Sequence, residues 1–541
     1  MNKNFNDAVS SFVRTNNNMN RNNRIHGNDF LNALKQENNF TRTTNGAIAK
    51  KSTGTKIYDL FSTGAAYRAR SESDCILLFK EAYLEDPKYA LKCLAYLRDI
   101  ESQGQGERRF FRVVLKWLAL YDVKAVKRNL EKLVKDNYCR WDDIFVLFDT
   151  PAEDCAMNLI REQLLDDINA YNAGANKSVS LAAKWMPSIN ASSSKTKANG
   201  RRIAHALGLT ERQYRKMLAK LRERINVVER LMSQNRWNEI EFDKLPSRAG
   251  LIYRNCFKNK GLIADKYRQF AQDTTKTVNA GKLYPYDIVS KAIELMGAGF
   301  RWTSKHVNFD DTERLMLNKY WANLPNVFPD GENFNAMVVC DTSASMLHGA
   351  SNTASPMEVA VSLAMYAAER ANGPFKNHYI SFSRNARLVE VVGTDFCDKV
   401  KRIVDSNVCE NTNLESVFNL VLSTAFQYNL NPSAMPETLI VISDQQVDAC
   451  AGIRGNKEVF MDTIRRKWHN ACASHGKNYN FPNIVFWNVN ATNTSFLDDN
   501  RSGITFVSGA SPALFTQIVA GLTGIDLMFK VLDSERYQPI G

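Results

Sequence analysis

The sequence predicts a multidomain protein in which an all-α helical-repeat region precedes an α/β domain with a doubly wound sheet. Between residues 74 and 319 the apolar side chains recur at steps of three and four, which is typical of amphipathic helices. After about residue 330, short β-branched runs alternate with helical stretches. The charge divides at the same place: residues 1–330 carry 54 Lys and Arg against 37 Asp and Glu, whereas residues 331–541 carry 16 against 20. The basic region is therefore a candidate for binding a polyanion, and a generally basic, soluble protein is the alternative.

The composition is that of a globular protein, with 44% hydrophobic and 23% charged residues among 541. This excludes a disordered or collagen-like chain. No apolar run approaches the roughly 18 residues that a membrane-spanning helix needs, and the first residues lack the apolar core of a signal peptide. The ten cysteines form no C-x-x-C pair, which favours reduced thiols. We therefore expect a cytoplasmic protein without a membrane partner.

The chain divides into four segments by local composition. Residues 1–45 are rich in Asn without a sustained period, which predicts a flexible tail. Residues 46–330 form the α-helical repeat domain, with short glycine-containing breaks between its helical stretches. Helix pairs stacked as HEAT-like repeats explain this pattern most economically, and an irregular helical bundle is the alternative. Residues 331–522 form the α/β domain, and residues 523–541 a C-terminal extension.

The elements of the α/β domain follow from its alternating pattern. Nearly all-apolar strands separated by amphipathic helices predict a buried, mostly parallel sheet covered on both faces. Because ligands bind at the carboxyl ends of the strands in such open sheets, polar residues at those ends are candidates for a site. The expected strands are residues 336–340, 379–382, 388–392, 438–442, 484–488 and 504–507, and the expected helices are residues 357–371, 414–427, 459–473 and 512–520.

Polar side chains with oxygen donors follow two of these strands. Asp341, Ser343 and Ser345 form a D-x-S-x-S pattern directly after the first strand, and Asp444 follows the fourth. Thr412 precedes a helix between them. Carboxylate and hydroxyl oxygens suit Mg²⁺, which prefers octahedral oxygen ligands and retains waters. The sequence therefore predicts a site for Mg²⁺ or another divalent cation, although D-x-S-x-S by itself also occurs as a helix cap.

These three elements resemble the metal-ion-dependent adhesion site of the von Willebrand factor A domain. The five residues named above carry the match, so the resemblance implies a von Willebrand A-like domain at residues 331–522. It also implies a divalent cation with an open position for an acidic residue of a protein ligand. The family often has Gly where this chain has Asn411 and Gln445. A degenerate domain that keeps these residues but binds no metal is the alternative.

The helical half resembles an uncharacterised family of plants, fungi and phages that joins a helical region to a C-terminal von Willebrand A-like domain. The stretches 41–60, 98–100, 104–108 and 184–188 carry this match. The layout is similar to that of the TROVE proteins, the Ro autoantigen family, in which a ring of helical repeats binds small structured RNAs and the ends of misfolded RNAs. This resemblance implies RNA as a partner.

The charge pattern indicates RNA independently. Residues 201–260 hold 15 Lys and Arg against 6 acidic residues, with the aromatic residues Tyr214, Trp237, Phe242, Tyr253 and Phe257 interleaved. Such a surface neutralises phosphates and can stack unpaired bases. A solvated basic helix with aromatic residues in the core is the alternative. The candidate RNA contacts are Arg201, Arg202, Arg212, Arg215, Lys216, Lys220, Arg222 and Arg224.

Signals for catalysis are weak. The chain has no G-x-S-x-G elbow and no phosphate-binding lysine loop, and its seven histidines form no recognisable triad. We therefore expect a non-enzymatic, Ro-like protein that binds small structured or single-stranded RNA, with a Mg²⁺-binding domain that engages an acidic ligand. The main alternative is a protein-interaction or assembly factor without RNA binding, including a phage-encoded or virion-associated one. A metal-dependent hydrolase is a third possibility.

Overall fold

The structure is a computed structural model, and the fold is given for the residues that it describes. A helical region extends to residue 322, and a six-stranded sheet with its helices begins at residue 336. The predicted order, helical region first and α/β domain second, is confirmed. The described residues are 34, 37–101, 104–174, 178–225, 227–297, 310–331, 333–348, 354–451, 458–492, 494–498, 503–519, 521 and 524–541.

An N-terminal hairpin precedes the helices. Strands β1 (Phe40–Arg42) and β2 (Ile48–Lys50) pair in antiparallel fashion. The predicted flexible tail is therefore wrong for residues 40–45, while most of that segment lies outside the described residues. The hairpin is held by the other end of the chain, because Lys50 and Phe496 exchange two backbone hydrogen bonds of 2.8 Å. Local composition carries no sign of a partner so distant in the sequence.

Most of the first helices begin where a polar side chain caps free backbone N–H groups. Asp86 accepts from the backbone of Lys88 and Tyr89, with Pro87 in the first turn, where its missing N–H costs nothing. Glu107 and Asp122 cap the next two helices in the same way. These helices are α3 (Lys56–Thr63), α4 (Glu72–Glu85), α5 (Pro87–Arg98), α6 (Arg108–Tyr121), α7 (Val123–Lys135) and α8 (Glu153–Asn172).

The later helices are more uneven in length. Helix α8 has 20 residues, whereas α12, α13 and α14 have 6 each, so the helices do not form repeats of equal length. No described helix is both long and apolar enough to span a bilayer. The later helices are α9 (Ala182–Trp185), α10 (Ser194–Ala206), α11 (Glu211–Arg224), α12 (Val228–Ser233), α13 (Ser247–Ile252), α14 (Arg254–Asn259), α15 (Gly261–Gln272), α16 (Pro285–Leu295) and α17 (Asp311–Ala322).

The α/β domain is built on one six-stranded sheet with the order β5-β4-β3-β6-β7-β8. All pairs are parallel except that between β4 and the edge strand β5. All six expected strands are present, the third two residues earlier than predicted. The strands are β3 (Ala336–Asp341), β4 (His378–Phe382), β5 (Ala386–Glu390), β6 (Thr438–Ser443), β7 (Asn483–Asn488) and β8 (Ile504–Ser508).

Among the described residues, six helices accompany the sheet, and four of them were expected. The sequence analysis did not include α19 and α23. The helices are α18 (Pro356–Arg370), α19 (Phe396–Ser406), α20 (Glu415–Gln427), α21 (Phe460–Ser474), α22 (Leu514–Val519) and α23 (Gly524–Leu532).

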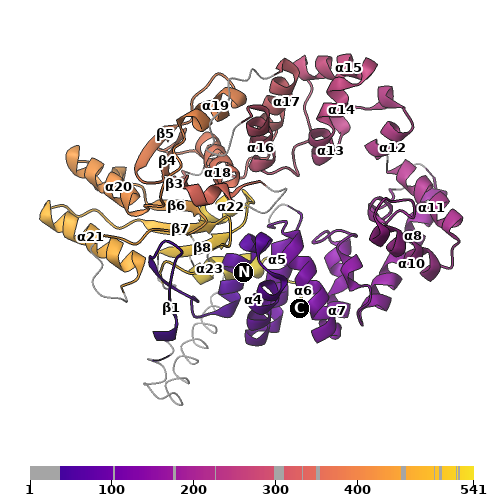
Figure 1. Ribbon diagram of the computed structural model, residues 1–541, viewed down its shortest axis with the longest axis horizontal. Helices are drawn as coiled ribbons and strands as arrows, with labels where there is room; N and C mark the ends of the chain where they lie inside the picture. Colours follow the sequence, from indigo (N-terminus) through magenta and orange to yellow (C-terminus); the bar gives the residue numbers. More distant parts are fainter. Residues whose placement is uncertain are drawn as a thin grey trace.

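The helical region forms an arc that leaves the α/β domain and returns to it (Figure 1). At one end α3 contacts β8, and at the other end α16 and α17 contact α18 and α19. The predicted C-terminal extension strengthens the first junction, because α23 packs on α3, α5 and β8. Beyond α23, Arg536 donates two hydrogen bonds of 3.0 and 2.8 Å to the Asp99 carboxylate, and the Tyr537 hydroxyl donates another of 2.9 Å. The arc and the α/β domain together form a closed ring.

The strand order also determines where a ligand site can form. The sheet extends from β3 in both directions, through β4 and β5 on one side and β6, β7 and β8 on the other. In open α/β sheets, a crevice forms outside the carboxyl ends of the two strands at such a switch point. Here those strands are β3 and β6, which end at Asp341 and Ser443. Asp341 and Asp444 therefore lie at one edge of the sheet.

Candidate cation site and nucleic-acid surface

The predicted cation-binding residues lie in loops that contact one another at this edge. Asp341 and Asp444 are both 0% exposed. The Asp341 carboxylate accepts from the backbone N–H of Ser343 at 2.9 Å and from the hydroxyl of Ser443 at 2.5 Å. The hydroxyls of Ser343 and Ser345 are 3.1 Å apart, and Ser345 also hydrogen-bonds Asp444. The first and third loops thus form one polar network.

The loop that carries Thr412 lies against both of the others. The backbone N–H of Ala344 donates to the Glu410 carbonyl at 3.0 Å, which joins it to the first loop. The backbone N–H of Asp448 donates to the Thr412 carbonyl at 2.9 Å, which joins it to the third loop. Thr412 itself is buried. The three loops that carry the five predicted residues are therefore in contact at this edge of the sheet.

The electrostatics of the two carboxylates fit a cation. Burial, followed by the negative charge of Asp444, raises the pKa of Asp341 to about 7. Burial likewise raises the pKa of Asp444. Neither carboxylate forms an ion pair with a Lys or Arg of the described chain. Two buried carboxylates without a positive neighbour repel each other, and a divalent cation relieves that repulsion.

The donor set differs from a cluster of acidic, His or Cys ligands. Within the described ranges, no three or more of those side chains are arranged to hold a metal. Here two carboxylates stand with three hydroxyls, a combination suited to a hard cation that keeps some of its waters. The residues present therefore fit Mg²⁺ by the chemistry of their donors.

The backbone directly after Asp444 is left-handed, at a position where the sequence departs from the von Willebrand A pattern that it resembles. Gln445 has φ of 60°, in the left-handed region that glycine adopts without cost. The position where the family often has Gly is thus one that requires positive φ. Gln445 adopts this positive φ, and its side chain is buried.

Two residues of the site escaped the sequence analysis. Ser443, which donates to Asp341, ends β6 beside the predicted Asp444, and this position at a strand end was the available signal. Asn45 comes from the N-terminal hairpin turn: its side-chain N–H₂ donates to the Gln446 carbonyl at 2.6 Å and lies 3.5 Å from the Thr412 hydroxyl. Nothing in the local sequence of Asn45 indicates this contact.

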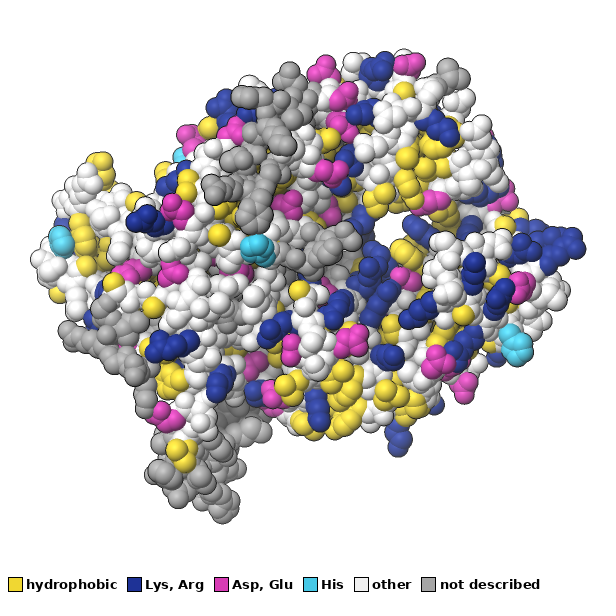
Figure 2. All heavy atoms as spheres, viewed as in Figure 1, with side chains coloured by type: hydrophobic (Ala, Val, Ile, Leu, Met, Phe, Trp, Pro, Cys, Tyr) yellow, Lys and Arg dark blue, Asp and Glu magenta, His cyan; other side chains and the backbone are white. Residues whose placement is uncertain are grey.

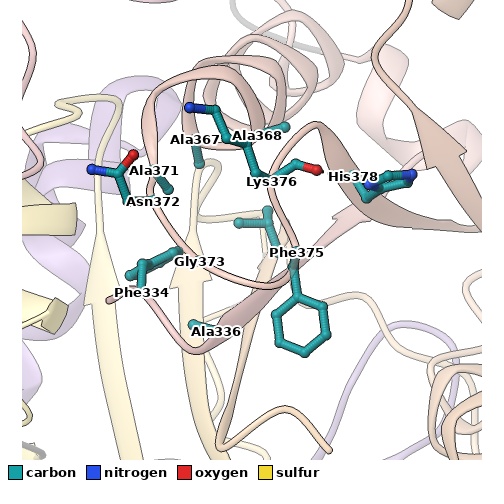
Figure 3. Close-up of a pocket in the computed structure, with 11 residues that line it drawn as sticks. Phe334, Ala336, Ala367, Ala368, Ala371, Asn372, Gly373, Phe375, Lys376 and His378 are labelled. Carbon is teal, nitrogen blue, oxygen red and sulfur yellow. Dashed lines mark hydrogen bonds between the residues drawn. The ribbon is translucent and has the colours of Figure 1, made fainter. Parts of the chain in front are cut away.

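A small pocket lies at the opposite end of β3 (Figure 3). It is lined by Ala336, where the strand begins, and by apolar side chains such as Phe334 and Phe375, with Lys376 and His378 beside them. Three of the candidate cation-binding residues, Asp341, Ser343 and Ser345, lie at the other end of this strand. The pocket is therefore separate from the candidate cation site.

In the helical half, four of the eight predicted RNA contacts are exposed on one face of α11. None forms an ion pair or hydrogen bond with a described residue. The acidic residues of this helix are already engaged, Glu211 by Arg201 at 2.9 Å and Glu223 by Arg230 at 2.6 Å. Lys and Arg side chains gather at the right-hand edge of Figure 2, where Figure 1 places α11. The four exposed residues are Arg212, Arg215, Lys216 and Lys220.

The other four predicted contacts have partners within the protein. Arg202 binds Glu153 and Asp149, and Arg222 donates to the backbone carbonyls of residues 183 and 186 at 2.9 and 2.7 Å. Because these two guanidinium groups hold neighbouring elements in place, we correct their assignment from RNA contacts to structural residues. Arg201 is paired as described above, and Arg224 donates to the Gly174 carbonyl at 2.6 Å.

The interleaved aromatic residues mostly belong to the core. Tyr214 is fully buried, and the rings of Phe242 and Phe257 pack with centroids 5.3 Å apart. Trp237 is half-buried beneath the Lys260 ammonium, which lies 4.1 Å from the ring centroid. The stacking prediction is therefore wrong for Tyr214, Phe242 and Phe257, and the alternative of a basic helix over an aromatic core is correct for them.

A second basic group was missed by the sequence analysis. Arg140 lies 4.9 Å from the ring centroid of Trp185, and Lys184 lies 5.4 Å from the same ring. Burial, together with the like charges of Arg98 and Arg248, lowers the pKa of Arg140. Figure 2 shows an opening through the molecule with Lys and Arg side chains gathered beside it. Lys184 and Trp185 belong to the stretch 184–188, which was the available signal.

Comparisons with known proteins divide the chain at the same place. A family described as a domain of unknown function (DUF2828) matches residues 43–145 and 153–327, and another domain of unknown function (DUF7788) matches residues 335–525. The chain is similar to "Uncharacterized protein L728" of Acanthamoeba polyphaga mimivirus, with 29% identity over 515 residues that cover 89% of this chain and 85% of that protein. Among solved structures it is similar to the Deinococcus radiodurans RO (RSR) protein, with a TM-score of 0.35 and 14% identity over 86% of this chain and 93% of that one.

Proposed function

The chain belongs to the DUF2828 family, and we propose that it is a non-enzymatic RNA-binding protein whose α/β domain holds a divalent cation. The observation that carries the RNA proposal is the exposed face of α11, with four cationic side chains and no acidic partner among the described residues. Unpaired Lys and Arg at this spacing neutralise successive backbone phosphates. Such contacts give affinity with little sequence information, which suits small structured or single-stranded RNA.

Salt dependence tests this proposal directly. Each single-strand phosphate neutralised contributes about 0.7 to the slope of log affinity against log salt, so four contacts give a slope of roughly −3. We expect a fluorescently labelled single-stranded RNA to bind the full chain at low salt and to dissociate as the salt concentration rises. Fluorescence anisotropy measures both. Absence of binding at the lowest salt at which the protein is soluble contradicts the proposal.

A second candidate function is protein interaction or assembly without RNA. Exposed apolar side chains on α4 and α6 favour it, since Leu84 is 64%, Leu120 62% and Tyr121 50% exposed. Clusters of this kind mark protein-binding surfaces when they are contiguous. This function becomes the preferred one if the salt titration detects no RNA binding.

For the α/β domain, we propose that the five-residue site holds Mg²⁺. Two buried carboxylates without a cationic partner and three adjacent hydroxyls support this assignment. A cation bound there neutralises the carboxylates and offers an open position to an acidic side chain of a partner. The residues that would hold it are Asp341, Ser343, Ser345, Thr412 and Asp444.

Thermal denaturation tests the cation site. Because Mg²⁺ would bind only the folded protein, a concentration 100 times the dissociation constant stabilises it by about 2.7 kcal/mol. We expect a higher thermal midpoint for the native chain and no shift for Asp444→Asn. Asp526→Asn, which changes an exposed carboxylate in α23, is the matched control and should respond like the native chain. An equal response of all three proteins would show that Mg²⁺ acts elsewhere.

A further inference from the structure

The turn of the N-terminal hairpin lies beside the candidate cation site. The Thr43 hydroxyl donates to the Val447 carbonyl at 2.7 Å, which fixes the turn to the loop that follows Asp444. The Asn45 side-chain amide donates to the carbonyl of the preceding residue, Gln446, at 2.6 Å. Residues more than 400 positions apart are thus joined at the edge of the sheet where the five site residues meet.

The Asn45 side chain makes a further contact inside the site. Its N–H₂ group lies 3.5 Å from the Thr412 hydroxyl oxygen and is directed at it as a donor. A donor–acceptor separation of this length corresponds to a weak hydrogen bond. The oxygen that receives the donor is the same atom that Thr412 would offer to a cation. An amide N–H₂ group carries partial positive charge. The amide and the cation therefore compete for the same Thr412 oxygen and repel each other.

We propose that Asn45 is an affinity-setting residue of the cation site, an internal competitor supplied by the N-terminal hairpin. The inference depends on the proposed cation site and adds a residue from the other end of the chain. Cation binding displaces the Asn45 amide from Thr412, while the hairpin remains attached through Thr43 and through the two Lys50–Phe496 backbone hydrogen bonds. Occupancy of the site is thereby coupled to the mobility of the hairpin turn.

Asn45 can be substituted without changing the strand pairing of the hairpin. Asn45 is exposed, and the strand pairing of β1 with β2 uses only backbone groups. Asn45→Ala removes the amide, and with it the hydrogen bond to the Gln446 carbonyl, but keeps the anchoring contacts of Thr43 and Lys50. Asn39→Ala is the matched control in the same hairpin. Its amide exchanges two hydrogen bonds of 3.0 Å with the Ser52 backbone and contacts none of the five site residues in the described structure.

The experiment is a titration of the full chain with Mn²⁺, in which free Mn²⁺ is measured by electron paramagnetic resonance. A weak hydrogen bond, at the lower end of the usual net contribution, corresponds to a change of roughly two- to threefold in affinity. We expect Asn45→Ala to bind Mn²⁺ more tightly than the native chain by about that factor, Asn39→Ala to bind like the native chain, and Asp444→Asn not to bind. In the native chain, Mn²⁺ should also accelerate amide hydrogen exchange at residues 43–47.

The outcomes separate the inference from the site on which it depends. Equal affinity of the native chain and Asn45→Ala overturns the inference and leaves the cation site intact. Weaker binding by Asn45→Ala, or slower exchange of the turn with Mn²⁺, also overturns it, because the hairpin then assists the cation. If no variant binds Mn²⁺, the cation site and the inference are both wrong.

Discussion

Changing Arg212, Arg215, Lys216 and Lys220 together to glutamine is expected to lower RNA affinity at about 50 mM salt by roughly three to four orders of magnitude. The estimate follows from counterion release. With a slope of about 0.7 per contact, each phosphate contact that is lost lowers the affinity at that salt roughly eightfold. These side chains are exposed and lack described partners, so their removal should leave the fold unchanged. Anisotropy titrations over a range of salt concentrations measure the loss, and the slope should fall by about 3.

A second four-glutamine variant controls for net charge. It changes four exposed cations of α6 and α7, which lie away from α11 in the ring (Figure 1). This control should keep most of the affinity and most of the slope. Equal losses in the two variants would show that total charge, and not the α11 face, determines RNA binding. The control residues are Lys116, Lys124, Lys127 and Arg128.

The fold of the α/β domain could be predicted because its strands are buried on both sides and therefore read as continuous apolar runs. The strand at residues 438–442 is an example, since every residue after Thr438 in β6 is buried. The edge strand β5 was placed two residues late. Its exposed and partly buried residues, Leu388 among them, do not form such a run. Strand order, by contrast, depends on pairing between distant segments, which periodicity does not reveal.

The same reason explains which site residues could be predicted. Asp341 ends β3 and Asp444 follows β6, so the local sequence is sufficient to place them at one sheet edge. Asn45 reaches the site only through a hairpin docked on residues 446–448. In the helical half, charge counting could not distinguish Arg202 from Arg212, because the acids that bind Arg202 lie about 50 residues earlier in the chain. Composition likewise does not show which aromatic residues are buried.

Asp143→Ala is expected to cause the largest loss of stability of any single substitution considered. The Asp143 carboxylate is 0% exposed and accepts hydrogen bonds from Arg98 at 2.9 Å, Arg112 at 2.6 Å and the Arg140 backbone N–H at 2.8 Å. Arg98 is only 2% exposed. Removing the carboxylate leaves this guanidinium buried without its counter-charge, which typically costs about 3–5 kcal/mol. Thermal and urea midpoints of the full chain measure the loss.

Two further variants show whether the uncompensated charge is the cause. Glu131→Ala breaks the exposed pair with Lys135 in α7 and should cost less than about 0.5 kcal/mol. The double variant Arg98→Met with Asp143→Leu removes both buried charges and should recover much of the stability, because apolar side chains of similar size can replace a buried ion pair. A midpoint for Asp143→Ala as high as that of Glu131→Ala would contradict the argument. Since Asp143 also fixes the backbone of Arg140, its loss should loosen the loop that places Arg140 against Trp185.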